Sequence, residues 1–123
     1  MALTENEQRA LNEYKNFLLQ RFPGQVERLI LFGSKARGEA RPGSDVDVLI
    51  VLDREEKPSR EGFYPLGLTN PVWREIVGMT FDFLMEYGID ISPLVISKSE
   101  YKKGSWLITR IKKEGVELWR KTG

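Results

Sequence analysis

Two aspartates, Asp45 and Asp47, stand two residues apart at the start of a run rich in β-branched and other apolar residues. Residues two apart in a β-strand point to the same face, so both carboxylates would lie on one side of the strand. Two like charges beside an otherwise buried strand repel each other unless a cation neutralises them. The pair is therefore a candidate site for one divalent cation, or for two cations about 3.5 to 4 Å apart.

A glycine and a serine, Gly33 and Ser34, directly follow the apolar run 29–32, and Lys35 opens a polar stretch after them. A turn or a helix that begins there would leave backbone N–H groups and a hydroxyl able to bind an anion, and glycine lets a phosphate approach the backbone closely. Arg37 adds a guanidinium that matches phosphate oxygens. Each feature alone is common in turns and on surfaces. Phosphate donors at one strand end and metal ligands at the next strand together predict recognition of a metal–triphosphate.

The spacing of these residues resembles a known signature. The pattern consists of Gly33-Ser34, ten further residues that include Arg37, and then Asp45-x-Asp47. It is similar to the motif of the DNA polymerase beta-like nucleotidyltransferase superfamily, above all to that of its minimal members, the MNT domains. The motif spans 15 residues, and the order of elements expected over most of the chain also fits. The resemblance implies that the Gly-Ser pair binds the triphosphate of ATP. It also implies that both aspartates hold Mg²⁺, with two ions expected and Mn²⁺ as an alternative.

The same resemblance implies a third carboxylate on a later strand, which completes the metal site and helps to activate the acceptor. By position this residue is Asp90, at the start of the third expected strand. The alternative is that Asp90 is only a turn aspartate between a helix and a strand, since it follows Gly88 closely. Asp82, inside the preceding helical pattern, is a weaker substitute.

Hydrophobic periodicity predicts an α/β (α+β) fold, in which helices pack on a small mixed β-sheet. Thr4 and Glu7 form a capping box that opens the first helix, and Asn70-Pro71 is typical of a helix start. Pro93 cannot donate a hydrogen bond within a sheet, which predicts that its strand lies at an edge or carries a bulge. The expected helices are residues 4–21, 71–88, 98–104 and 106–113, and the expected strands are 26–32, 45–52, 90–97 and 116–119.

The same periodicity predicts which residues form the core. The first helix is expected to bury Leu11, Tyr14, Phe17 and Leu18, and the second long helix carries a stripe of methionine and aromatic side chains. Residues 53–68 are charged and broken by prolines and glycines, so they are expected to form a loop.

The composition limits the possible chemistry. The chain has no cysteine and no histidine, which excludes disulfides, thiolate nucleophiles, metal sites built on either residue and a histidine base. Carboxylates remain, and they suit hard cations such as Mg²⁺. The 123 residues are expected to form a single nucleotidyltransferase domain over residues 1–123. The net charge of +1 argues against a nucleic-acid partner, and the lack of a long apolar run or leader segment predicts a cytoplasmic protein without membrane contact.

The acceptor is the least determined part of the reaction. Stand-alone MNT proteins are often paired with small helical HEPN proteins, as the antitoxin of toxin–antitoxin modules. The resemblance therefore implies transfer of AMP from ATP to a tyrosine hydroxyl of such a toxin. Two alternatives stay open, a non-catalytic module that binds a partner and an adenylyltransferase that acts on a small molecule. Residues 98–123 carry eight basic residues against three acidic ones, which indicates a solvated helix face or, together with the loop at 53–68, a docking surface for a partner.

Overall fold

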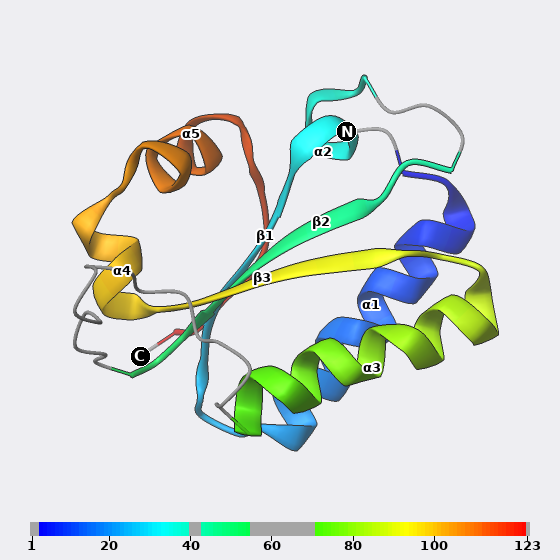
Figure 1. Cartoon of the computed structure of the whole chain (residues 1–123), viewed down its shortest axis with the longest axis horizontal. Helices are drawn as coiled ribbons and strands as arrows, with labels where there is room; N and C mark the ends of the chain where they lie inside the picture. The colour runs from blue at the N-terminus through cyan, green and yellow to red at the C-terminus, as the bar shows by residue number, and fades with distance from the viewer. Residues whose placement is uncertain (1–2, 40–42, 55–70, 123) are drawn as a thin grey trace.

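The computed structural model describes residues 3–39, 43–54 and 71–122, and Figure 1 shows how the elements are arranged. Each helix and strand expected from the sequence is present. A short helix, α2, occupies the polar stretch where the sequence allowed either a turn or a helix start. In chain order the elements are α1 (Glu5–Arg21), β1 (Val26–Phe32), α2 (Gly33–Arg37), β2 (Val46–Leu52), α3 (Pro71–Tyr87), β3 (Ile91–Ser97), α4 (Lys98–Lys103), α5 (Trp106–Glu114) and β4 (Val116–Arg120).

The strands of the described chain form one mixed sheet in the order β3-β2-β1-β4, which confirms the predicted fold class. β1 runs antiparallel to β2 and β4, whereas β2 and β3 are parallel, with α3 lying between them in the chain. The end of β1 therefore meets the start of β2, and the start of β3 lies on the other side of β2. As a result, one end of the sheet gathers α2 and the residues that precede β2 and β3.

β3 is an edge strand, as Pro93 predicted, and Pro93 lies opposite Val48 of β2. The two strands begin one residue later than expected. Pairing starts at Val46 and Ile91, so Asp45 and Asp90 immediately precede the strands instead of forming their first residues.

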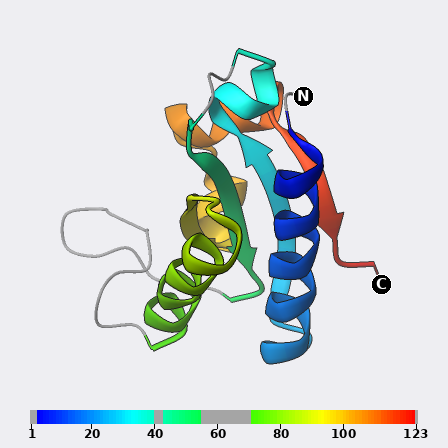
Figure 2. The same cartoon turned by 90° about the vertical axis from the view of Figure 1, so that its right-hand side faces the viewer.

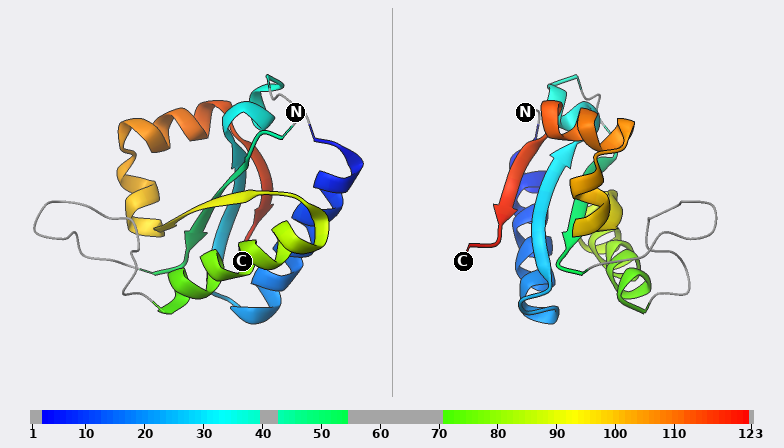
Figure 3. Two further views of the ribbon diagram at one scale, coloured as in Figure 1. Left: turned by 45° about the vertical axis from the view of Figure 1, so that its right-hand side comes forward. Right: turned by 90° about the vertical axis from the view of Figure 1, so that its left-hand side faces the viewer.

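Helices cover both faces of the sheet, because β2 is apolar on both sides. Val48 and Ile50 point to the face on which α1 and α3 pack, and the two helices lie side by side in Figure 2. Leu49 and Val51 point to the opposite face, where they pack with Ile108 of α5. Figure 3 shows α4 and α5 on the side of the sheet away from α1.

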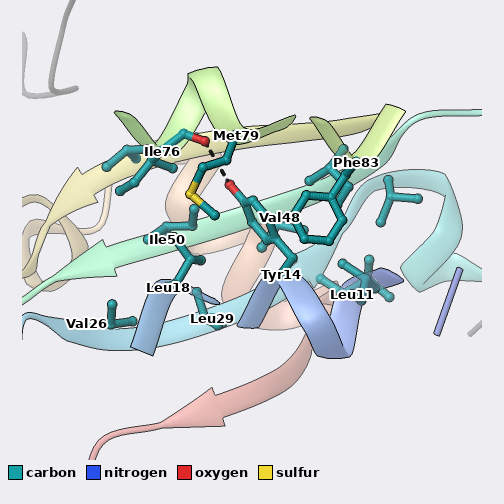
Figure 4. Close-up of a cluster of buried hydrophobic side chains, with 14 of the residues drawn as sticks. Leu11, Tyr14, Leu18, Val26, Leu29, Val48, Ile50, Ile76, Met79 and Phe83 are labelled. Atoms are coloured by element: carbon teal, nitrogen blue, oxygen red, sulfur yellow. Dashed lines mark hydrogen bonds between the residues drawn. The ribbon is translucent and has the colours of Figure 1, made fainter. Parts of the chain in front are cut away.

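The core between α1 and α3 is built around Tyr14, which is fully buried. Its hydroxyl donates to the backbone carbonyl of Ile76 at 3.4 Å, and its ring meets that of Phe83 edge-on with the centroids 5.4 Å apart (Figure 4). The prediction for Phe17 was wrong, since this side chain is 42% exposed. Phe17 lies at the margin of the buried stripe of α1, which runs through Leu11, Tyr14 and Leu18.

The local signals at the helix ends also match the structure. Thr4 and Glu7 form the predicted capping box of α1, and the Ser97 hydroxyl accepts a hydrogen bond from the Glu100 N–H at the start of α4. The predicted cap at Asn70 and most of the predicted loop 53–68 lie outside the described residues. Within the described ranges, no helix is both long enough and apolar enough to cross a membrane.

Candidate active site

Gly33 and Asp47 are in direct contact across β1 and β2. Phe32 pairs with Asp47 in the antiparallel register, so the next residue, Gly33, lies beside the aspartate. Gly33 has φ +75°, and a Cβ added there would lie 2.2 Å from Oδ2 of Asp47. Glycine is required both for this backbone conformation and for the space that the carboxylate occupies. The structure therefore brings together the Gly-Ser stretch and the aspartate pair, as the spacing in the sequence predicted.

Asp45 and Asp90 lie next to each other at the starts of two parallel strands. The Val46 N–H donates to the backbone carbonyl of Asp90 at 2.9 Å, which ties the residues before β2 and β3 together. The carboxyls of Asp45 and Asp90 are close enough to share a hydrogen bond when one of them is protonated. Partial burial, this hydrogen bond and the charge of Asp45 raise the pKa of Asp90 above its usual value.

Asp47 is the most enclosed of the three aspartates. Burial raises the pKa of Asp47, and the negative charges of Asp45 and Asp90 raise it further, while the nearby Arg37 partly offsets them. All three acidic side chains are thus close enough to repel one another. From the sequence, Asp90 could be either a third carboxylate of the site or only a turn residue. In the structure it lies in this cluster.

The three aspartates fit a divalent cation in charge and in ligand chemistry. The charge of Asp45 destabilises the ionised forms of Asp47 and Asp90, and within the described ranges none of the three aspartates is ion-paired with a lysine or arginine. Carboxylate oxygens are the ligands that Mg²⁺ and Mn²⁺ prefer. No three acidic residues of the described chain are close enough to form a ready-made metal cage. Asp45 and Asp90 are exposed, so a cation could draw these two side chains toward Asp47.

The residues of α2 that were predicted to bind phosphate do not all face the same cleft. Gly33 and Arg37 line the same cleft. Ser34 is half-buried between them in the chain. Lys35 differs, because its side chain is 6% exposed and its ammonium lies 2.6 Å from a carboxylate oxygen of Glu7 in α1. The Lys35 ammonium is therefore engaged with another part of the fold.

A cleft of about 250 Å³ runs along α5 on one side of this centre. Gly33 and Arg37 form one wall, while Arg110 and Glu114 of α5 form the charged part of the other. The rest of the lining is apolar and consists of Phe32, Leu107 and Ile111. The position beside the Gly-Ser stretch makes it the candidate site for a polyphosphate.

A second cleft, of about 280 Å³, has Asp90 and Ser44 in its lining. It is bordered by Glu7 and Lys35, and it shares no lining residue with the cleft along α5. The acidic centre thus has a cleft beside Gly33 and another beside Asp90. Two reactants could approach the same carboxylates through them.

The sequence pointed to neither Arg110 nor Glu114 as site residues. They belong to the basic segment that was interpreted as a solvated face or a docking surface. Arg110 and Glu114 are four residues apart, a spacing that predicts an ion pair within one helix. This spacing does not predict a contact of Glu114 with Arg37. The contact between Arg37 and Glu114 joins residues far apart in the chain, and it depends on how α5 packs beside α2.

Comparison with known proteins agrees with this geometry. A family model described as a nucleotidyltransferase domain matches residues 11–113, and the chain belongs to this family. A relative from Methanocaldococcus jannaschii, named "putative protein adenylyltransferase", is 30% identical over 116 residues, which cover 93% of this chain and 99% of the relative. Two further relatives from the same organism carry the same name. The chain is accordingly a nucleotidyltransferase related to proteins named as protein adenylyltransferases.

Two solved structures share the fold. A crystal structure described as a putative nucleotidyltransferase from Sulfolobus solfataricus matches with a TM-score of 0.53 and 21% identity, covering 92% of this chain and 79% of that one. A structure described as a toxin–antitoxin with AMP-PNP matches with a TM-score of 0.54 and 16% identity, covering 89% and 73%. At these identities the likeness concerns the fold.

Proposed function

We propose that the chain transfers AMP from ATP to a hydroxyl of a partner protein, and that residues 1–123 form one domain that carries the site. Asp45, Asp47 and Asp90 would hold the divalent cations, Mg²⁺ or in its place Mn²⁺. The contact between Gly33 and Asp47 is the observation that supports this proposal most directly. The contact puts the Gly33-Ser34 stretch beside Asp47, and transfer of a nucleotide from a metal–triphosphate would need phosphate donors and metal ligands at such a distance.

The nucleotide would bind with its phosphates against the Gly33-Ser34 stretch. The Ser34 hydroxyl and the Arg37 guanidinium are suited to the β- and γ-phosphates, since charge-assisted hydrogen bonds to phosphate are strong. Lys35 would contribute through its backbone N–H, because its ammonium is paired with Glu7. When bound, the divalent cations neutralise the charge on the phosphate oxygens.

The transfer would be an in-line displacement. The acceptor oxygen forms a bond to the α-phosphorus while the bond from that phosphorus to the pyrophosphate oxygen breaks, and pyrophosphate leaves. Asp90 would take the proton of the acceptor hydroxyl, since a positioned carboxylate can act as a general base. The cleft that Asp90 borders gives the acceptor its own approach to the centre. The chain has no histidine, so a carboxylate is the natural group for this role.

We assign the acceptor to a tyrosine of a small helical HEPN-type toxin, which would make the chain the antitoxin. Two observations favour a protein acceptor. The M. jannaschii relatives are named as protein adenylyltransferases, and the fold is shared with a structure described as a toxin–antitoxin with AMP-PNP. The described part of the chain adds no large substrate-gripping domain to the sheet and its helices, so a partner would present the hydroxyl.

The test is transfer of label to a defined partner. The chain is purified and incubated with Mg²⁺ and α-labelled ATP, once with a lysate of its source cells and once with any small helical protein that a neighbouring gene encodes. We expect label on one tyrosine of that protein, located by peptide mass spectrometry, and no label with Asp47→Asn. Absence of label with the natural chain on any protein would overturn the proposal. If Asp47→Asn neutralised the toxin equally well, the chain would be a non-catalytic binding module, and turnover without any protein would indicate a small-molecule acceptor.

A further inference from the structure

We propose that Arg110 is a second phosphate-binding arginine, and that Glu114 is a displaceable counter-ion which holds Arg110 and Arg37 until a nucleoside triphosphate binds. The inference rests on the proposed function, because it assigns further residues to the same nucleotide site. It predicts that the cleft along α5 recognises the terminal phosphate of the nucleotide.

The two arginines approach a single carboxylate oxygen of Glu114, and Arg37 also donates from its Nε to Glu39 at 3.0 Å. Oε2 of Glu114 lies 3.4 Å from Nε of Arg110 and 3.7 Å from a terminal nitrogen of Arg37. All three side chains line the cleft that also contains Gly33. A carboxylate oxygen between two guanidiniums occupies the kind of position that a phosphate oxygen would take, since both are anionic acceptors for the same donors.

The pairs with Glu114 are weak enough to be displaced. The side chains of Arg37, Arg110 and Glu114 are 33%, 51% and 35% exposed, and ion pairs at this exposure are strongly screened by water. A terminal phosphate carries more charge than one carboxylate and offers three oxygens, so it competes well for two guanidiniums. The Arg110 guanidinium also lies over the Trp106 ring, 5.7 Å from its centroid, which keeps it beside the cleft when Glu114 withdraws.

The positions of Arg37 and Arg110 favour a nucleoside triphosphate over a nucleoside monophosphate. Gly33 touches Asp47, so the phosphate that reacts lies at the acidic end of the site. The charge of Arg37 acts on Asp47 whereas that of Arg110 does not, and Arg110 reaches the same cleft from α5. Arg110 would therefore contact the phosphate farthest from the reacting one, which a nucleoside triphosphate has and a monophosphate lacks. The competing explanation is that Arg110 and Glu114 only stabilise α5 as neighbours one turn apart.

The experiment compares Arg110→Gln with Lys113→Gln, which removes one positive charge from an exposed position of the same helix. Binding of ATP and of AMP, each with Mg²⁺, is measured by calorimetry, and helix content by circular dichroism. For Arg110→Gln we expect Kd for ATP to rise about tenfold, the value of one charged hydrogen bond, with Kd for AMP unchanged. Lys113→Gln should leave both values unchanged, and Glu114→Gln should lower Kd for ATP.

Three results would overturn the inference. The first is that Arg110→Gln and Lys113→Gln bind ATP equally well. The second is that Arg110→Gln loses affinity for ATP and for AMP by the same factor. The third is that Glu114→Gln binds ATP more weakly than the natural chain. Because the readout is binding, it is separate from the acceptor. A natural chain that binds ATP but labels no protein would contradict the proposed function and leave this comparison intact.

Discussion

The ammonium of Lys35 lies 2.6 Å from a carboxylate oxygen of Glu7, and the two side chains are only 6% and 7% exposed. Glu7 also accepts a hydrogen bond from the Thr4 N–H in the capping box. Burial alone would raise the pKa of Glu7, but the hydrogen bonds from Lys35 and Thr4 outweigh it and lower the pKa below its usual value. This buried ion pair joins the first turn of α1 to the helix that carries the phosphate-binding residues.

Removing Lys35 should therefore destabilise the fold more than removing the pair. Lys35→Met leaves the Glu7 carboxylate buried without a cation, which should lower the free energy of unfolding by about 3 to 5 kcal/mol. The double variant Lys35→Met/Glu7→Gln keeps a hydrogen-bonding side chain for the capping box, so it should be more stable than the single variant. Urea unfolding of the natural chain and both variants measures this. A double variant less stable than Lys35→Met would contradict a direct pairing of the two charges.

The same double variant tests how Lys35 takes part in the site. If Lys35 contributes only its backbone N–H, the double variant should bind ATP with Mg²⁺ as the natural chain does. Glu7→Gln alone is the control for any change in the position of α1. A selective loss of ATP affinity in the double variant would show that the ammonium binds phosphate after leaving Glu7.

Gly33 and Gly38 provide a matched pair of substitutions at the two ends of α2. Both have φ +75°, so alanine is strained at either position by about 1 kcal/mol or more. At Gly33 the new Cβ would also lie 2.2 Å from Oδ2 of Asp47, whereas at Gly38 it would meet nothing within 4 Å. Gly33→Ala should displace the carboxylate and lower transfer about a hundredfold relative to Gly38→Ala, because misplacing a reacting group has that effect. Equal activity of the two variants would argue against Asp47 as a metal ligand.

The features predicted correctly from the sequence are those with local causes. Pro71 and the capping box of Thr4 and Glu7 act within a few residues, and Pro93 indicated an edge strand because of its own missing N–H. The contact of Gly33 with Asp47 was predictable because the short connection between two neighbouring strands, residues 33–45, leaves little choice of partner. The direction of the Lys35 side chain depends on where α1 lies, and the role of Arg110 depends on where α5 lies. Neither position follows from local sequence.

Replacing Asp47 should separate stability from activity. Burial and the charges of Asp45 and Asp90 raise the pKa of Asp47, so its ionised form is less favourable in the folded chain than in the unfolded one. The resulting loss of stability is absent below the ordinary pKa of 3.8 and complete above the raised value. Asp47→Asn should therefore unfold at a higher temperature than the natural chain at pH 7, with a smaller difference at pH 4. Its transfer activity should fall about a hundredfold or more, as expected for the loss of a metal ligand.

Mg²⁺ gives the control for this prediction. A cation that binds the folded chain raises its melting temperature, and neutralising the repelling carboxylates adds to that effect. The natural chain should be stabilised by Mg²⁺ more than Asp47→Asn at the same concentration. If Mg²⁺ stabilised both chains equally, the ion would bind elsewhere, and the acidic centre would need another explanation.

Asp53 should have the opposite pH dependence, and it lies at the other end of β2. Its carboxylate accepts a hydrogen bond from the Lys121 ammonium at 2.7 Å and is ion-paired with Lys98 at 2.8 Å, which lower the pKa of Asp53 to about 2. A lowered pKa means that ionised Asp53 stabilises the folded chain above its ordinary pKa of 3.8, and that this stabilisation is lost as the pH falls through about 2. Asp53→Asn should thus reduce the free energy of unfolding at pH 6 and make a much smaller difference near pH 2. Urea unfolding at both values checks the sign, and Lys121→Met should reproduce the pH dependence in part, because Lys98 still pairs with Asp53. A loss of stability in Asp53→Asn that is the same at pH 6 and pH 2 would show that the carboxylate acts by packing and not by its charge.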